Sequence, residues 1–201
     1  MMFVSVAIGL CVVSVLLSLF RQKGPKGREN ISVICGPNGG GKTLLFYHIM
    51  EYLSGKSFLP EDTITLPSLE TNKSSYEGRE IIDVPGTSRF QHELLSLWSK
   101  CNKCVFVVDL TQLYDDDYVY DVADTFVRFL DSEYLLRNES FALFLNKTDE
   151  IVIATEEEAL EIIETGINKV IDSKNLQPNN VKNRTHFSFD DYNFTTFYDS
   201  F

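Results

Sequence analysis

The segment GPNGGGKT, residues 36–43, is the feature that most restricts how this chain can fold. It follows the apolar run ISVIC (residues 31–35) and precedes LLFYHIM, which predicts a buried strand, a glycine-rich loop and then a helix. Glycines in such a loop let backbone N–H groups turn toward bound phosphates, and the dipole of the following helix adds positive potential. The pattern therefore predicts a P-loop that holds a nucleoside triphosphate.

The residues expected to contact the phosphates are Gly36, Asn38, Gly39, Gly40, Gly41, Lys42 and Thr43. Lys42 supplies a positive charge, and the hydroxyl of Thr43 is placed to bind Mg²⁺. A glycine-rich turn that merely caps a helix is the alternative. The strand before the loop and the helix after it favour phosphate binding instead.

A second motif, IIDVPG at residues 81–86, follows another apolar run. Asp83 ends a predicted strand and can hold Mg²⁺ through water, while the Gly86 N–H can contact a γ-phosphate. The pattern is weak by itself, because an aspartate that ends a strand before a Pro-Gly turn is common.

A third motif, NKTD at residues 146–149, identifies the base. Asp149 can accept hydrogen bonds from N1–H and the exocyclic amine of guanine, a pair of donors that adenine lacks. Asn146 can bond the other edge of the base and neighbouring loops, and the alkyl stem of Lys147 can cover the ring. Because ligands bind at the C-terminal ends of parallel strands, the three motifs together predict a guanine nucleotide site.

Short apolar runs alternate with helical patterns along the rest of the chain. Strands are expected at residues 31–35, 65–71, 80–84, 105–109, 141–145 and 194–198, and helices at 42–53, 91–98, 119–136 and 156–171. The strands near 65–71 and at 80–84 are expected to pair through a loop at residues 72–78. This alternation predicts an α/β fold of the P-loop NTPase type, with a doubly wound and mostly parallel sheet.

Residues 1–20 contain no charged side chain, and twenty helical residues span about 30 Å, the thickness of the hydrocarbon core of a bilayer. Four basic residues follow within residues 21–28. These features favour a transmembrane signal-anchor helix over a cleaved signal peptide or a buried helix. The basic cluster, interpreted as a juxtamembrane linker, places the domain at residues 29–201 in the cytosol.

The charge balance of that domain limits its partners. Residues 29–201 hold all 29 acidic residues but only 14 basic ones. Contacts with nucleic acid phosphates need Lys and Arg, so direct binding of nucleic acid is not expected.

The segments GPNGGGKTLLF, IIDVPG, VFVVD and NKTD resemble the Ras/Arf-type small GTPases. The apolar N-terminal segment, KTLLF and CVFVVDLTQLYDDDYVYDVADTFVRFLDSE are most similar to the family of signal recognition particle receptor β subunits. The resemblance implies a single-pass protein of the endoplasmic reticulum membrane with a small GTPase fold that binds GTP or GDP with Mg²⁺. It also implies that the GTP-loaded form binds the α subunit of the receptor.

Some positions depart from the family pattern or are hard to align with it. Thr87 stands where such GTPases place a Gln or His that orients water, so hydrolysis is expected to be slow or dependent on a partner. The switch threonine that would bind Mg²⁺ is assigned to Thr63, with Thr65 as the second candidate, although both could simply begin a strand. The last guanine-contacting loop is assigned to Ser200, with Ser188 as a weaker candidate. The terminal helix of the family is not found after Ser200.

Three functions stay open at this point. The first is a membrane-anchored binding switch, and the second is an Arf-like trafficking GTPase whose turnover acts as a timer. Thr87 and the lack of a glycine at position 2 count against the second. The third is a pseudo-GTPase scaffold with an empty or permanently loaded site.

Overall fold

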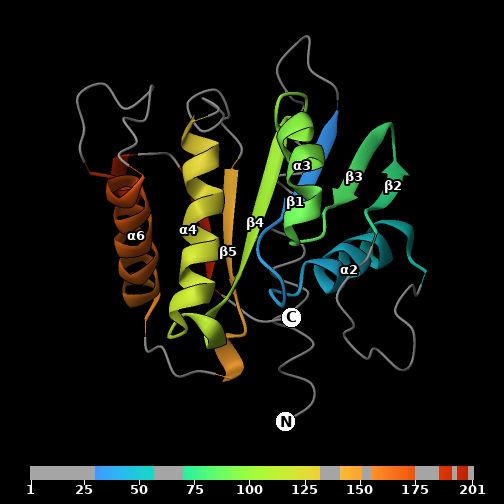
Figure 1. Cartoon of the computed structure of the whole chain (residues 1–201). Helices are drawn as coiled ribbons and strands as arrows, with labels where there is room; N and C mark the ends of the chain where they lie inside the picture. Colours follow the sequence, from blue (N-terminus) through green and yellow to red (C-terminus); the bar gives the residue numbers. More distant parts are fainter. Residues whose placement is uncertain are drawn as a thin grey trace.

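The computed structural model describes residues 30–56, 70–131, 141–150, 155–174, 186–191 and 194–198. The strands of this part of the chain form one six-stranded sheet in the order β2-β3-β1-β4-β5-β6 (Figure 1). They are β1 (Ile31–Cys35), β2 (Asn72–Tyr76), β3 (Arg79–Asp83), β4 (Lys103–Asp109), β5 (Phe141–Asn146) and β6 (Thr195–Tyr198). Neighbouring strands are parallel except for the β2–β3 pair. The predicted α/β fold with a mostly parallel sheet is confirmed.

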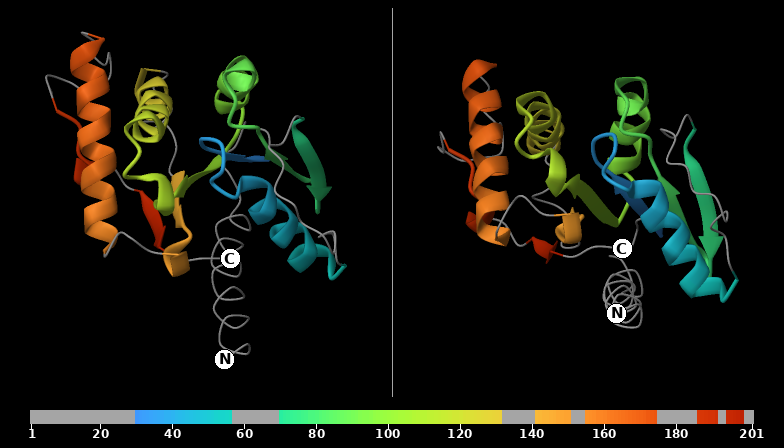
Figure 2. Two further views of the ribbon diagram at one scale, coloured as in Figure 1. Left: turned by 60° about the horizontal axis from the view of Figure 1, so that its bottom comes forward. Right: turned by 90° about the horizontal axis from the view of Figure 1, so that it is seen from below.

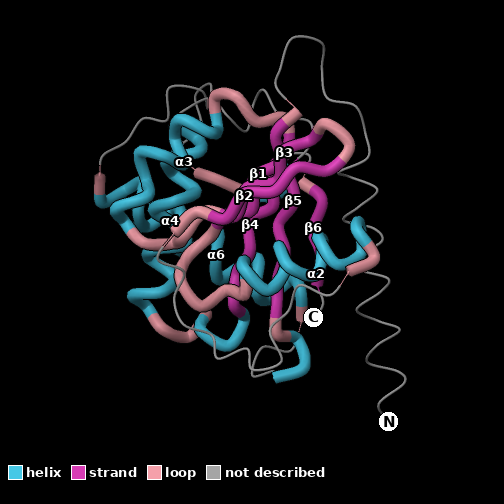
Figure 3. Tube along the Cα trace, turned by 90° about the vertical axis from the view of Figure 1, so that its right-hand side faces the viewer, coloured by secondary structure: helices cyan, strands magenta, loops and turns pink. Residues whose placement is uncertain are grey.

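Helices cover both faces of the sheet. The α-helices are α2 (Lys42–Ser54), α3 (Gln91–Trp98), α4 (Asp116–Asp131) and α6 (Glu156–Ser173), and the short 3-10 helices are η1 (Ser88–Phe90), η2 (Leu110–Gln112), η3 (Thr148–Glu150) and η4 (Phe189–Asp191). Figures 2 and 3 show α3, α4 and α6 on one face and α2 on the other. The described part of the chain is therefore a three-layer α/β structure.

Strand β4 contributes side chains to the hydrophobic core on each face of the sheet. Cys104, Phe106 and Val108 belong to the core under α3, α4 and α6, whereas Val105 and Val107 belong to the core under α2. Both faces of the strand are buried, so its sequence is a continuous apolar run rather than an alternating one. Because β4 runs parallel to β1 and β5, its last residue, Asp109, lies at the same edge of the sheet as the ends of those strands.

The predicted hairpin partner of β3, residues 65–71, is wrong. The antiparallel partner is β2, residues 72–76, and the Tyr76–Arg79 pair closes the hairpin. Glu77 and Gly78 form its turn with φ angles of 49° and 74°, as a two-residue turn with positive φ at both central positions requires. Strand β2 has the polar sequence NKSSY and lies at the edge of the sheet, so a search for apolar runs misses it.

Several predictions concern residues outside the described ranges. These are the anchor at residues 1–20, the basic linker at residues 21–28, Thr63, Thr65 and Ser200. Within the described ranges, no helix is long and apolar enough to cross a membrane.

Candidate nucleotide-binding site

The glycine-rich loop joins the end of β1 to the start of α2 and lies against β4. Gly36 has a φ of 136°, which side-chain-bearing residues rarely adopt. A Cβ atom on Gly36 would lie 2.2 Å from the carbonyl oxygen of Val107, so no larger residue fits without moving the backbone. Gly41, with a φ of 90°, is the N-cap of α2. Together these positions give the tight loop and open helix N-terminus that phosphate binding needs.

Lys42 is buried beneath this loop. Its Nζ donates a hydrogen bond to the carbonyl oxygen of Pro37 at 2.5 Å, which holds the ammonium group across the loop. Burial lowers the pKa of Lys42, and the charge of the Asp83 carboxylate opposes that shift. A bound phosphate would supply further negative charge and favour the protonated lysine.

Thr43 and Asp83, the two predicted Mg²⁺ residues within the described ranges, are in direct contact. The Thr43 hydroxyl donates to Oδ2 of Asp83 at 2.8 Å, and Nδ2 of Asn72 donates to the same oxygen at 2.9 Å. Burial raises the pKa of Asp83, although these two hydrogen bonds and the charge of Lys42 oppose the shift. The other carboxylate oxygen, Oδ1, is buried and has no hydrogen-bond partner within the described structure. An unpaired buried carboxylate oxygen beside a threonine hydroxyl fits a Mg²⁺ ion held directly or through water.

The turn after β3 lies against the glycine-rich loop. A Cβ atom on Gly86 would be 2.6 Å from the backbone nitrogen of Asn38, the carbonyl oxygen of Gly36 and the carbonyl carbon of Pro37. Any side chain at position 86 would therefore displace the loop. The second motif thus lies beside the first, as its predicted contact with a γ-phosphate requires.

The NKTD segment follows β5 and is tied to the glycine-rich loop. Nδ2 of Asn146 donates to the carbonyl oxygen of Gly40 at 3.0 Å, while its Oδ1 is buried without a partner in the described part of the chain. Lys147 has a φ of 66°, and Asp149 is exposed on η3. The segment is therefore anchored to the loop at Asn146 and exposes Asp149 at its far end.

Two residues near these loops were not predicted to belong to the site. Asn72 supports Asp83, and Asp109 accepts a hydrogen bond from Nζ of Lys147 at 2.7 Å. The motif VFVVD offered a signal for Asp109, because it places a carboxylate at the end of a strand as Asp83 does. No comparable signal exists for Asn72, whose position depends on the β2–β3 register.

The weaker candidate for the last guanine loop, Ser188, lies before β6 rather than after it. Its hydroxyl donates to Oε1 of Glu164 on α6 at 3.1 Å. Ser188 thus joins the segment before β6 to helix α6.

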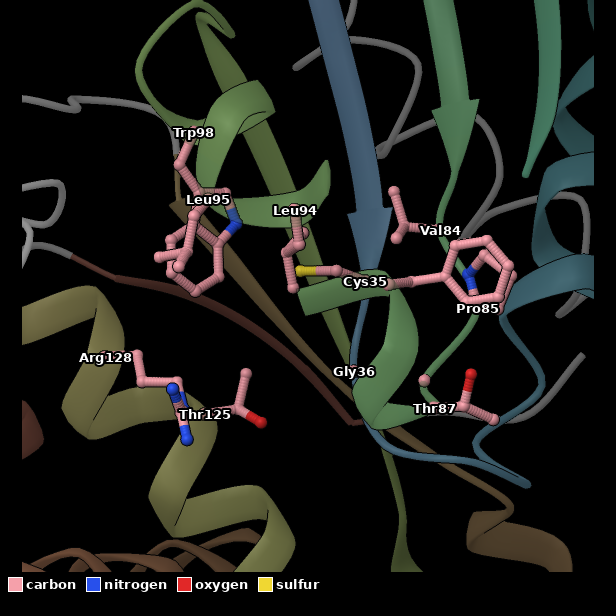
Figure 4. A pocket seen from close by; sticks show the side chains of 12 residues that line it. Cys35, Gly36, Val84, Pro85, Thr87, Leu94, Leu95, Trp98, Thr125 and Arg128 are labelled. Carbon is pink, nitrogen blue, oxygen red and sulfur yellow. The ribbon is translucent and has the colours of Figure 1, made fainter. Parts of the chain in front are cut away.

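A pocket borders the turn at Gly86 and Thr87. Figure 4 shows Leu94, Leu95 and Trp98 of α3 on one side of it and Thr125 and Arg128 of α4 on another. The Thr87 hydroxyl is buried and makes no hydrogen bond within the described residues. Thr87, the residue expected in place of a water-orienting Gln or His, is thus a short side chain that lines this pocket.

A sequence model of the family described as signal recognition particle receptor beta subunit matches residues 27–197. The chain belongs to this family. The match covers the glycine-rich loop, Asp83 and the NKTD segment of this family member, which agrees with the resemblance of its motifs.

Solved structures share the fold of this β-subunit family member. The mammalian SRP receptor matches with a TM-score of 0.61 and 22% identity, over 85% of this chain and 89% of that chain. The SRb-GTP/SRX complex from Chaetomium thermophilum matches with a TM-score of 0.62 and 16% identity, over 89% and 90% of the two chains. The Arl6 BBS3 small GTPase from Trypanosoma brucei, with a bound nucleotide analogue, GppNp, gives a TM-score of 0.55 and 18% identity, over 85% and 86%. These matches show a small GTPase fold. A separate comparison with curated protein sequences finds no significant match.

Proposed function

We propose that this chain is the GTP-binding β subunit of a signal recognition particle receptor and holds the α subunit at the endoplasmic reticulum membrane when GTP is bound. The observation that carries the proposal is the meeting of the glycine-rich loop with Asp83 and with the NKTD segment, in a chain whose residues 27–197 match this family. One solved structure with a similar fold is an SRb-GTP/SRX complex, which supports a protein partner that binds the GTP-loaded form.

In this proposal the triphosphate lies on the glycine-rich loop at the N-terminus of α2. The residues that contact it are Gly36, Asn38, Gly39, Gly40, Gly41, Lys42, Thr43 and Gly86. Bound Mg²⁺ neutralises phosphate charge, and Thr43 and Asp83 are the described residues that hold it. The unpaired Oδ1 of Asp83 supports this role.

The guanine base is held by the NKTD segment. Asp149 accepts from the base, Asn146 keeps the segment against the glycine-rich loop, and the stem of Lys147 covers the ring. Ser200 is proposed for the last base contact, and Thr63 is proposed as the switch threonine that completes the Mg²⁺ shell. The closing of Thr63 and Gly86 around the γ-phosphate then creates the surface that the α subunit recognises.

Membrane attachment is assigned to residues 1–20, with the cytosolic domain beginning at residue 29. The uncharged apolar segment and the four basic residues after it support this topology. Membranes that carry the full chain should retain it through carbonate extraction, and protease added to the cytosolic side should degrade the domain. Release by carbonate, or protection of the domain, would contradict the topology.

The proposed function is tested by capture of the α subunit. The full chain, purified in detergent, is loaded with a non-hydrolysable GTP analogue or GDP, or is stripped of nucleotide, and is then offered the N-terminal domain of the α subunit. We expect strong capture with the GTP analogue and weak capture in the other two states. Equal capture in all three states would exclude a nucleotide-dependent switch.

The two alternative functions are separated by nucleotide content and turnover. Guanine nucleotide should bind to the chain and exchange with added nucleotide, whereas a pseudo-GTPase scaffold would either bind none or keep a copurified nucleotide that does not exchange. Single-turnover hydrolysis should be slow without a partner, because Thr87 is too short to orient water. Fast hydrolysis by the isolated chain would favour the Arf-like timer.

A further inference from the structure

We infer that Asp109 is a positioning residue for guanine nucleotide binding, one that fixes Lys147 beside the base and connects the NKTD segment to the glycine-rich loop through Gln112. This inference rests on the proposed function, because it assigns a role within the same site. Asp109 touches neither the phosphates nor the base in this assignment, and it acts through Lys147 and Gln112.

The carboxylate of Asp109 is fully buried and accepts four hydrogen bonds. Its Oδ2 accepts from Nζ of Lys147 at 2.7 Å and from Nε2 of Gln112 at 2.5 Å. Its Oδ1 accepts from the backbone N–H and the hydroxyl of Thr111 at 3.0 and 2.6 Å. With both oxygens in use, the carboxylate has a single orientation, and Lys147 is held by a fixed partner.

The backbone of Asp109 is fixed as firmly as its side chain. Its N–H donates to the hydroxyl oxygen of Tyr118 on α4 at 2.7 Å, in the interior of the protein. On the sheet, Asp109 pairs in register with Asn146, the first residue of the NKTD segment. Asp109 is therefore placed beside Lys147 by the β4–β5 register, and the positive φ of Lys147 turns the chain away from β5 at this point.

Gln112 connects the same carboxylate to the glycine-rich loop. A Cβ atom on Gly39 would lie 2.8 Å from Nε2 of Gln112 and 3.9 Å from Oδ2 of Asp109, so the Gln112 amide lies close to the loop and the carboxylate lies behind it. Asn146 makes a second connection through its bond to the Gly40 carbonyl oxygen. A shift of the loop at Gly39 would therefore displace Gln112 and, through the hydrogen bonds to Asp109, change the position of Lys147.

The charge of Asp109 agrees with this role. Burial alone would raise the pKa of Asp109, but the hydrogen bonds from Lys147, Thr111 and Gln112 and the charge of Lys147 outweigh it and leave the pKa below its ordinary value. The carboxylate is thus ionised at neutral pH. Removing its charge would free the ammonium of Lys147, whose side chain is 33% exposed, to turn toward solvent.

The test is a double-mutant cycle on the full chain, with fluorescent GDP and a fluorescent GTP analogue as probes. Asp109→Asn should weaken both nucleotides alike, by about tenfold, because a charge-assisted bond is replaced by a neutral one. Lys147→Gln should weaken them by a similar factor. The double variant should bind no more weakly than the weaker single variant, because both substitutions break the same contact. Asp121→Asn, an exposed aspartate on α4, is the matched control and should bind as the unchanged chain does.

Two outcomes distinguish this inference from the proposed function. Failure of the unchanged chain to bind either probe would refute the proposed function itself. Binding by the unchanged chain, together with independent and multiplying losses in the double variant, would overturn the role of Asp109. If Asp109→Asn does not fold, Lys147→Arg is compared with Lys147→Gln: only the arginine should keep most of the affinity, and equal binding by the two would also overturn the inference. Melting temperatures without nucleotide separate a loss of binding from a loss of stability.

Discussion

The hydroxyl of Thr43 donates a hydrogen bond to Oδ2 of Asp83 at 2.8 Å, across 40 residues of sequence. This contact joins the first turn of α2 to the end of β3 and leaves Oδ1 of Asp83 buried and unpaired within the described structure. A buried carboxylate oxygen without a donor is costly unless a cation or a cation-bound water completes it. The pair therefore predicts how the site responds to Mg²⁺.

Asp83→Asn should abolish the gain in GTP affinity that Mg²⁺ provides, with a loss of about 10–100-fold, as for residues that support a metal. In EDTA the variant should be at least as stable as the unchanged chain, because burial raises the pKa of Asp83 and so disfavours its charge in the absence of a cation. Nucleotide titrations with excess Mg²⁺ and with EDTA measure the first effect, and thermal melts measure the second. An undiminished Mg²⁺ effect in the variant would show that Asp83 is not at the metal site.

Gly86→Ala should destabilise the chain and weaken GTP binding, because its methyl group would overlap three backbone atoms of the glycine-rich loop at 2.6 Å. The loop must move before the alanine can fit. The comparison is Gly78→Ala, in the β2–β3 turn, where φ is 74° and no atom lies within 4 Å of the added Cβ. That variant should lose only about 1 kcal/mol of stability and no GTP affinity. Equal losses in the two variants would mean that the contact of Gly86 with the loop is unimportant.

Asp149→Asn should reduce the preference for guanine, because the amide cannot accept two hydrogen bonds from N1–H and the exocyclic amine. Loss of such a paired contact costs about 1–3 kcal/mol of discrimination. The variant should in turn bind xanthosine triphosphate better than the unchanged chain does. Competition between GTP and xanthosine triphosphate measures the change in base preference. An unaltered order of affinities would refute the assignment of Asp149 to the base.

Lys103→Met should stabilise the protein at neutral pH. Lys103 is buried at the start of β4, and no described group pairs with its Nζ. Burial, together with the charge of Arg79, lowers the pKa of Lys103 from 10.5 to about 8. Protonation is therefore penalised in the folded state, and we expect the methionine to add about 1–3 kcal/mol of stability.

The pH dependence of the stability gain distinguishes an effect of the Lys103 charge from an effect of packing. Between pH 8 and 10.5 the unfolded chain binds the Lys103 proton and the folded chain does not, so stability rises with pH in this window. The advantage of Lys103→Met should be full below pH 8 and should disappear toward pH 10.5. Denaturant unfolding at several pH values measures it, with the exposed Lys100→Met as the control. An advantage independent of pH would assign the gain to packing rather than to charge.

Local patterns predicted most of the secondary structure correctly. Strand β1 has the expected bounds, and so does α3, because an apolar run and an amphipathic period are local properties of the chain. The error lies at β2, which is polar and forms a strand only because β3 supplies its hydrogen-bond partner. Helix α4 begins at Asp116 with Asp117 in its first turn, where acidic side chains are favoured by the helix dipole.

For the candidate site too, residues in local motifs were predicted, whereas contacts between distant segments were not. Lys42, Thr43, Asp83 and Asn146 were predicted because each stands at a fixed distance from a strand end within a short motif. Asn72, Asp109 and Gln112 were not predicted, because their contacts follow from which strands and helices are neighbours. A hydrogen bond such as that between Asn72 and Asp83 depends on sheet register, which no single segment specifies.

The sequence by itself determined that this chain carries a phosphate loop and a guanine motif on an α/β fold, because glycine spacing and strand-end motifs are encoded locally. Only the tertiary structure decided how the motifs are joined. Asp109 became the partner of Lys147 because the β4–β5 register places it beside Asn146, and Gly86 came to lie on the glycine-rich loop because β1 and β3 are parallel neighbours. Such contacts depend on the order and register of strands distant in sequence, which packing of the whole core selects.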